Sequence, residues 1–165
     1  MVSVKVQPPG TILTMMYVKE RLKRHMPGKF IEVGPGCSGE ISRILLELRW
    51  TGTAYELSQD SISILNCRFE ENIKNKKFRV KNLDWLKADE FENADLIVSC
   101  NVIEHLSSTE EQKFIDKSYS LLNKNGLLIG VVPSSEKHWG IEDDIAGHFR
   151  RYSEKMVMKL FDDQK

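Results

Sequence analysis

The sequence is poor in the features that define several large classes of protein. Its three cysteines, Cys37, Cys67 and Cys100, are odd in number and include no CxxC pair, which argues against a disulfide framework and fits a reducing compartment. No apolar run approaches the roughly 18 residues needed to cross a membrane. The N-terminus also lacks the long apolar stretch of a secretory signal. These absences predict a cytoplasmic protein without a membrane span.

The chain also lacks a net charge. Its 165 residues carry 24 basic and 24 acidic side chains, so no overall positive field exists to gather nucleic acid. A nucleic-acid partner is therefore not expected, although the basic run at 74–81 (KNKKFRVK) keeps RNA open as an alternative substrate. The length suits a single domain over residues 1–165, and a hydrophobic fraction of 41% is ordinary for a globular core.

The sequence does contain a regular alternation of short apolar runs and amphipathic segments. Strands are expected at 29–33, 53–57, 77–82, 95–101 and 127–132, and helices at 14–25, 39–49, 61–72, 110–122 and 153–161. Strands that alternate with helices pair in parallel through right-handed crossovers. The pattern predicts an α/β fold with a Rossmann-like, doubly wound, mostly parallel sheet of five strands.

A glycine-rich loop follows the first expected strand. The segment 32–39 reads EVGPGCSG, so Gly34, Gly36 and Gly39 have the G-x-G-x-x-G spacing of dinucleotide-binding turns. Glycines at such a turn let backbone amides approach a ligand closely, and the N-terminus of the next helix favours electron-rich groups. The loop therefore predicts a ligand site, but the spacing alone does not identify the ligand.

Two carboxylates narrow the choice of ligand. Glu32 lies two residues before Gly34, where it would repel a pyrophosphate and attract a positively charged amino group. Glu56 ends the second expected strand, about 20 residues further on, where a carboxylate can accept hydrogen bonds from ribose hydroxyls. The pair describes a ligand with an amino-acid end and a ribose end, such as S-adenosylmethionine. An NAD-dependent oxidoreductase is the alternative, against which Glu32 argues.

With these residues the chain resembles the class I S-adenosylmethionine-dependent methyltransferases. Glu32, Gly34 and Gly36 match the family's E/D-x-G-x-G motif, and the segments NVIEHL (101–106), LNKNGLL (122–128) and GHFRRYS (147–153) are similar to segments of its small-molecule group, which includes ubiquinone-pathway enzymes. The resemblance implies transfer of a methyl group from S-adenosylmethionine to a nucleophilic atom of a small-molecule substrate. A methyltransferase-like module that binds its ligand without turnover is a further alternative.

The resemblance also implies a set of site residues. The cofactor would be bound by Glu32, Gly34, Pro35, Gly36, Gly39, Glu56, Leu57, Asp84, Trp85, Asn101 and Val102. Asp84 would meet the adenine amino group, and Trp85 would either stack on adenine or close the hydrophobic layer. The candidate catalytic residue is His105, as a base or as a wall of the pocket.

A second set of residues would meet the substrate. These are His105, Trp139, His148, Arg150 and Tyr152, and His148, Arg150 and Tyr152 alternatively hold their own loop together. His, Cys and Glu show no zinc-ligand spacing along the chain, so no metal is expected.

The family fold normally ends in an antiparallel hairpin after the last helix, and this hairpin is missing from the expected elements. Either the fifth strand is a bare edge, which invites a second copy of the chain to pair with it or cover it, or the sequence is part of a longer protein.

Overall fold

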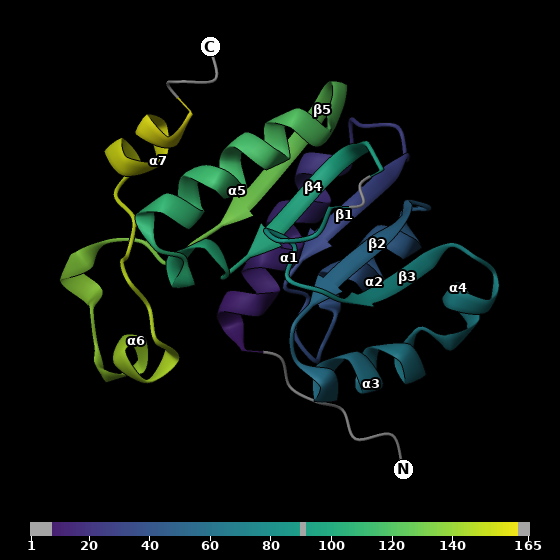
Figure 1. The fold of residues 1–165 in the computed structure, drawn as a ribbon, viewed down its shortest axis with the longest axis horizontal. Coiled ribbons are helices and arrows are strands. Elements are labelled where there is room, and N and C mark those ends of the chain that lie inside the picture. The colour runs from purple at the N-terminus through teal and green to yellow at the C-terminus, as the bar shows by residue number, and fades with distance from the viewer. Residues whose placement is uncertain (1–7, 90–91, 162–165) are drawn as a thin grey trace.

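A five-stranded parallel sheet forms the centre of the protein in a computed structural model that describes residues 8–89 and 92–161. The strands are β1 (Lys29–Val33), β2 (Thr51–Glu56), β3 (Phe78–Asn82), β4 (Ala94–Cys100) and β5 (Leu122–Val131). Their spatial order is β3-β2-β1-β4-β5, and every neighbouring pair runs parallel (Figure 1). The strand order reverses between β1 and β4. In open α/β sheets, ligands bind outside the carboxyl ends of the strands at such a point.

Helices cover both faces of this sheet. They are α1 (Pro9–Leu22), α2 (Glu40–Glu47), α3 (Gln59–Arg68), α4 (Glu70–Lys74), α5 (Ser108–Leu121), α6 (Ile141–Ala146) and α7 (Glu154–Leu160), with short 3-10 helices η1 (Ile103–His105) and η2 (Glu136–His138). Figure 1 shows α5 in front of the sheet and α1 and α2 behind it. The expected α/β, doubly wound architecture is therefore confirmed.

Two hydrophobic cores lie on opposite faces of the sheet because successive strand residues point in opposite directions. On one face, α1, α2 and α3 pack against Phe30 and Phe78. On the other, α5 places Phe114 and Ile115 against Ile31. Phe30 and Ile31 are adjacent in β1 and belong to different cores, which fixes the register of this central strand.

All five predicted strands are present, with shifted ends. Segment 122–126 joins β5, which extends that strand toward its N-terminus relative to the prediction. The first helix begins earlier than predicted because Pro9 occupies its first turn, where the lost N–H has no cost. The predicted helix 61–72 divides into α3 and α4 at Phe69, whose ring is buried in the core. The long loop before the last helix contains α6, which the sequence analysis did not predict.

Within the described residues, β5 pairs only with β4 and forms one edge of the sheet. A cavity of about 650 Å³ runs along this edge, lined by parts of α1, β5 and α7. No antiparallel strand follows α7 within residues 8–89 and 92–161. None of the helices in this part of the chain combines the length and the apolar character that crossing a bilayer requires.

Candidate active site

The loop between β1 and α2 turns through three glycines with left-handed backbone conformation. Gly34, Gly36 and Gly39 have φ angles of +69°, +61° and +54°. A Cβ atom on Gly34 would lie 2.5 Å from Cγ2 of Val102, and one on Gly39 would lie 2.6 Å from Cδ2 of Leu65, whereas Gly36 faces open space. The first and third glycines are therefore required for packing as well as conformation, and Gly36 leaves room beside the loop for a ligand.

Glu32 is buried beneath this loop, with 4% of its surface exposed. Its carboxylate accepts a hydrogen bond from the hydroxyl of Ser42 in α2. Burial raises the pKa of Glu32 to about 7, which the Ser42 hydrogen bonds only partly oppose and the charge of Glu56 reinforces. A buried carboxylate of this kind gains most from a cationic partner, since a nearby positive charge restores its ionised form.

Glu56 is held against the glycine loop by backbone amides. Its Oε2 atom accepts from the N–H of Gly36 at 3.0 Å, and its Oε1 atom accepts from the N–H groups of Leu57 at 2.8 Å and Ser58 at 2.9 Å. An ionised carboxylate has about four acceptor positions, so Oε2 can still accept from a ligand hydroxyl. The carboxylate thus has a fixed orientation and a free acceptor position.

A cavity of about 120 Å³ opens between the carboxyl ends of the strands. Six of the predicted cofactor residues line it, namely Gly34, Glu56, Leu57, Asp84, Trp85 and Val102. Leu57 and Leu83 at this cavity are 68% and 45% exposed. The volume is below the roughly 300 Å³ at which pockets enclose a drug-sized ligand, so the cavity can enclose only one part of a nucleoside-sized molecule.

Asp84 and Trp85 have different environments at this cavity. Asp84 accepts from the backbone N–H of Leu86 at 3.0 Å and pairs with Lys87. Partial burial opposes ionisation of Asp84, but these hydrogen bonds outweigh it and lower its pKa. Trp85 is only 2% exposed and packs on Phe114 with ring centroids 4.9 Å apart. It therefore closes the hydrophobic layer and also contributes to the cavity wall.

The chain leaves β4 through a strained turn. Asn101 has a φ of +55°, is exposed, and donates its backbone N–H to the Val131 carbonyl at 2.8 Å. Val102 then packs against Gly34. Helix η1 follows directly and places Glu104 and His105 at the carboxyl end of the sheet.

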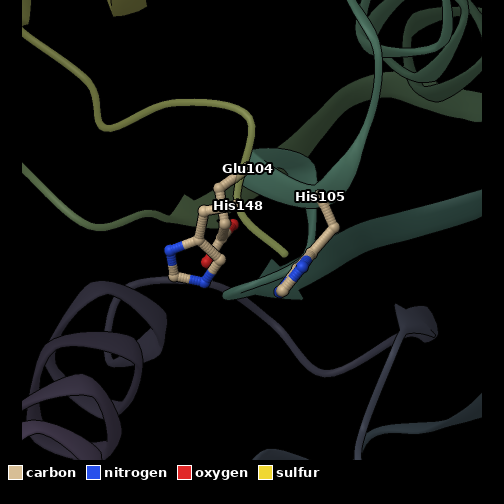
Figure 2. A group of neighbouring side chains, drawn as sticks. All are labelled: Glu104, His105 and His148. Atoms are coloured by element: carbon tan, nitrogen blue, oxygen red, sulfur yellow. The ribbon is translucent and has the colours of Figure 1, made fainter. Parts of the chain in front are cut away.

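Glu104, His105 and His148 converge at this end of β4. Figure 2 shows Glu104 and His105 projecting from η1 and His148 from the loop between α6 and α7. The two imidazole rings meet edge to face with centroids 4.6 Å apart. Partial burial and the neighbouring His148 lower the pKa of His105, which favours its neutral form. The fold thus brings His148 beside Glu104 and His105, from which it is distant in the sequence.

Asp143 orients the ring of His148 through a hydrogen bond. This aspartate is 1% exposed and accepts from Nδ1 of His148 at 2.8 Å, from Nε of Arg151 at 2.9 Å and from the Gly140 N–H at 2.8 Å. The hydrogen bond from Arg151, with those from Gly140 and His148, holds the pKa of Asp143 well below its usual range. Asp143 is therefore a fixed negative charge that fixes the position of the His148 ring.

The other two residues of this segment connect the loop to α5. Arg150 pairs with Glu111 at 2.8 Å and donates to the Leu106 carbonyl at 3.0 Å. Tyr152 is buried, and its hydroxyl donates to Glu111 and to the Ile103 carbonyl. These contacts correspond to the alternative in which Arg150 and Tyr152 hold the loop together.

Trp139 lies apart from these contacts. It is exposed and donates its indole N–H to Asp144 of α6 at 3.0 Å.

Several residues that support the site were missed by the sequence analysis. Ser42, Asp143 and Glu111 are buried polar residues that bind predicted site residues. Ser42 has a signal in the sequence, because it is a polar residue within the apolar inward face of α2. Asp143 and Glu111 have none, because each lies beside another acidic residue in a polar segment that is typical of a solvated surface.

The basic run 74–81 lies elsewhere on the sheet. Lys76, Lys77, Arg79 and Lys81 line a groove of about 310 Å³ with residues of β1 and β2. Glu92 pairs with Arg79 at 2.9 Å in this groove, so part of the positive charge is neutralised.

The family of the chain follows from a match to a family model described as a methyltransferase domain, which covers residues 31–128. The chain belongs to this family. The matched range includes the glycine loop, Glu56, Asp84 and η1, and it ends before His148. A search of curated proteins found no significant match.

Solved structures share the same fold. TehB from Haemophilus influenzae has a TM-score of 0.73 and 22% identity over 90% of this chain and 50% of its own. Magnesium protoporphyrin IX methyltransferase from Synechocystis PCC 6803, with bound S-adenosylhomocysteine (SAH), has a TM-score of 0.75 and 17% identity over 93% and 72%. The N-methyltransferase NodS from Bradyrhizobium japonicum WM9, also with SAH, has a TM-score of 0.75 and 16% identity over 95% and 76%. The chain thus spans about half the length of TehB.

Proposed function

We propose that the protein is an S-adenosylmethionine-dependent methyltransferase that acts on a small molecule. The observation that carries this proposal is the pair of carboxylates flanking the glycine loop, with Glu32 buried beneath it and Glu56 hydrogen-bonded to its Gly36 amide. One can meet a cationic amino group and the other a ribose hydroxyl. Membership of the methyltransferase-domain family and structural neighbours crystallised with SAH support the same ligand.

The residues around the loop would hold the cofactor in an extended pose. Glu32 and the loop 34–39, including Pro35, would bind the methionine end, and Glu56 would accept from the ribose. Leu57, Asp84 and Trp85 would enclose the adenine in the 120 Å³ cavity, and the backbone at Asn101 and Val102 would border the sulfonium. The cofactor supplies an activated methyl group, so the protein contributes chiefly the alignment of acceptor and donor.

The acceptor would lie beside His105 and His148 at the end of β4. This position is next to the cofactor residues because Val102, which contacts Gly34, precedes η1 by one residue. Arg150 and Tyr152 would act indirectly, since their hydrogen bonds fix the loop that carries His148. Trp139 would contact only the outer part of a bound substrate.

Calorimetry with S-adenosylmethionine, SAH and NADH tests the cofactor. We expect both sulfur ligands to bind and NADH not to bind, because Glu32 repels a pyrophosphate. Binding of NADH without binding of S-adenosylmethionine would overturn the proposal in favour of an oxidoreductase. Incubation with methyl-labelled cofactor and fractionated extract then identifies the acceptor. Binding without label transfer to any fraction would support a non-catalytic module.

An RNA acceptor is the second candidate because Lys76, Lys77, Arg79 and Lys81 line one groove. It predicts RNA binding that weakens steeply with salt. We favour the small molecule, because Glu92 neutralises part of that groove and the chain has no net charge.

We also infer that the chain forms a homo-oligomer through the exposed edge of β5 and functions in the cytoplasm. The unpaired edge and its 650 Å³ cavity support the first inference. The free thiols of Cys37, Cys67 and Cys100 support the second, since they suit a reducing compartment.

A further inference from the structure

We propose that Glu104, His105 and His148 form a binding site for a divalent transition-metal ion, with zinc as the reference metal. One ligand atom from each residue lies within 4.8 Å of the other two. Figure 2 shows the carboxylate of Glu104 beside the two imidazole rings.

The carboxylate of Glu104 is the strongest sign of a missing partner. Its side chain is 0% exposed, and neither oxygen has a hydrogen-bond partner in another described residue. A buried carboxylate without hydrogen bonds is costly unless it is neutralised or coordinates a metal. The two histidines beside it are the residues that most commonly complete such a site.

His148 has the second contact that metal-binding histidines characteristically make. Its Nδ1 atom is hydrogen-bonded to Asp143 at 2.8 Å. Because a carboxylate only accepts, Nδ1 donates in this contact and Nε2 is the nitrogen available to a metal ion. Carboxylate–histidine–metal arrangements use this contact to fix the tautomer and raise ligand basicity.

The donor set selects the class of metal. Two imidazole nitrogens and one carboxylate oxygen suit Zn²⁺ and also Fe²⁺, Co²⁺ or Mn²⁺, whereas Mg²⁺ and Ca²⁺ prefer oxygen ligands alone. Tetrahedral zinc separates its ligand atoms by roughly 3.3 Å. Side-chain movements of about 1 Å would therefore complete the coordination, and His105 is exposed and can make such a movement.

Three protein ligands leave at least one coordination position for another molecule. This further step rests on the proposed function: a hydroxyl group of the acceptor would bind there and lose its proton to solvent, because a metal lowers the pKa of a bound oxygen. The oxygen would then attack the methyl carbon. The O–CH3 bond forms as the S–CH3 bond breaks, and the electron pair goes to sulfur, which becomes a neutral thioether.

Metal binding by the full chain tests the site without any assay of methyl transfer. The chain is stripped with a chelator, dialysed, and titrated with Zn²⁺ by calorimetry and with Co²⁺ by visible absorption. The variants are Glu104→Gln and His148→Ala, with His138→Ala as the matched control, since His138 is an exposed histidine outside the cluster. Thermal unfolding with and without metal is measured for each protein.

We expect the wild-type chain and the His138→Ala variant to bind one equivalent of either metal, with Co²⁺ visible bands and a raised Tm. Glu104→Gln and His148→Ala should lose at least about 10-fold in affinity. Glu104→Gln is nearly isosteric, so a folded variant without metal binding is the expected result. Absence of binding to the wild-type chain would overturn the proposal, as would unchanged affinity in both cluster variants. Either outcome leaves binding of S-adenosylmethionine, and so the proposed function, separately testable.

Discussion

Replacement of Glu32 by glutamine removes a carboxyl group whose pKa burial raises to about 7 beneath the glycine loop. The pKa of Glu32 rises from 4.5 to about 7 in the folded chain, with burial as the largest cause. Each pKa unit corresponds to about 1.36 kcal/mol, so this shift makes ionised Glu32 a cost of about 3 kcal/mol to folding. The glutamine side chain keeps the shape of glutamate and can still accept from the Ser42 hydroxyl.

The sign of the effect follows from proton linkage. The folded state holds the Glu32 proton more tightly than the unfolded chain does. Protonated Glu32 therefore stabilises the folded state; this contribution is fully present below pH 4.5 and is lost as the pH rises through about 7. Glu32→Gln has no such titration. The stability of the wild-type chain relative to this variant should therefore fall by about 3 kcal/mol between about pH 4.5 and about pH 8.

Urea unfolding at several pH values measures this difference. Glu71→Gln, which alters an exposed glutamate of α4, serves as the control and should show no comparable trend. The same samples are unfolded with S-adenosylmethionine at about 100 times its Kd, which should stabilise the wild-type chain by about 2.7 kcal/mol and the Glu32→Gln variant much less. If the difference in free energy of unfolding between the wild-type chain and Glu32→Gln does not change with pH, the raised pKa of Glu32 is refuted.

Three further substitutions test the glycine loop, the ribose contact and the sheet edge. Gly34→Ala should destabilise the chain by about 1–3 kcal/mol in urea unfolding, because Gly34 has a φ of +69° and an added Cβ would lie 2.5 Å from Val102. Gly10→Ala is the control and should not destabilise the chain, because a Cβ at Gly10 would have no neighbour within 4 Å. Glu56→Gln should weaken binding of SAH about 10–100-fold in calorimetry, because it removes a hydrogen bond to a charged group. Unchanged affinity would contradict the proposal that Glu56 binds the ribose. Gly130→Lys adds a charge to the β5 edge without a clash, and should reduce the mass found by light scattering from dimer to monomer, whereas Gly10→Lys should not. A wild-type chain that is monomeric at high concentration would contradict pairing at this edge.

Most of the fold could be predicted because its information is local. The strands are short buried runs between turn residues, and their alternation with helices determines parallel pairing. The exceptions have physical causes: α6 contains Glu142, Asp143 and Asp144, so its composition is typical of a solvated loop. The early start of β5 depends on pairing of Ala94 with Leu122, which no property of the segment itself reveals.

The positions of the residues proposed to bind the cofactor were also predictable, for the same reason. The glycine loop, Glu32 and Glu56 lie in or beside elements whose geometry follows from the sequence order. The parallel pairing of β1 and β2 brings their carboxyl ends together, where Glu56 contacts the Gly36 amide. Residues that act through distant contacts were not predictable. Ser42 supports Glu32 from within a helix, and Asp143 supports His148 from within an acidic run.

The segment 147–153 explains why contact with substrate and stabilisation of the loop are not exclusive alternatives for one motif. Gly147, with a φ of +73°, ends α6 and turns the chain toward η1. The following residues anchor the segment: Phe149 donates its backbone N–H to the Glu104 carbonyl at 2.8 Å, and the side chains of Arg150 and Tyr152 bind α5 and η1. These anchors hold His148 beside Glu104, where a ring on a free loop would sample many positions. The side chains of Arg150 and Tyr152 thus support the role proposed for His148, and substitution of Arg150 should weaken the cluster without changing any of its three members.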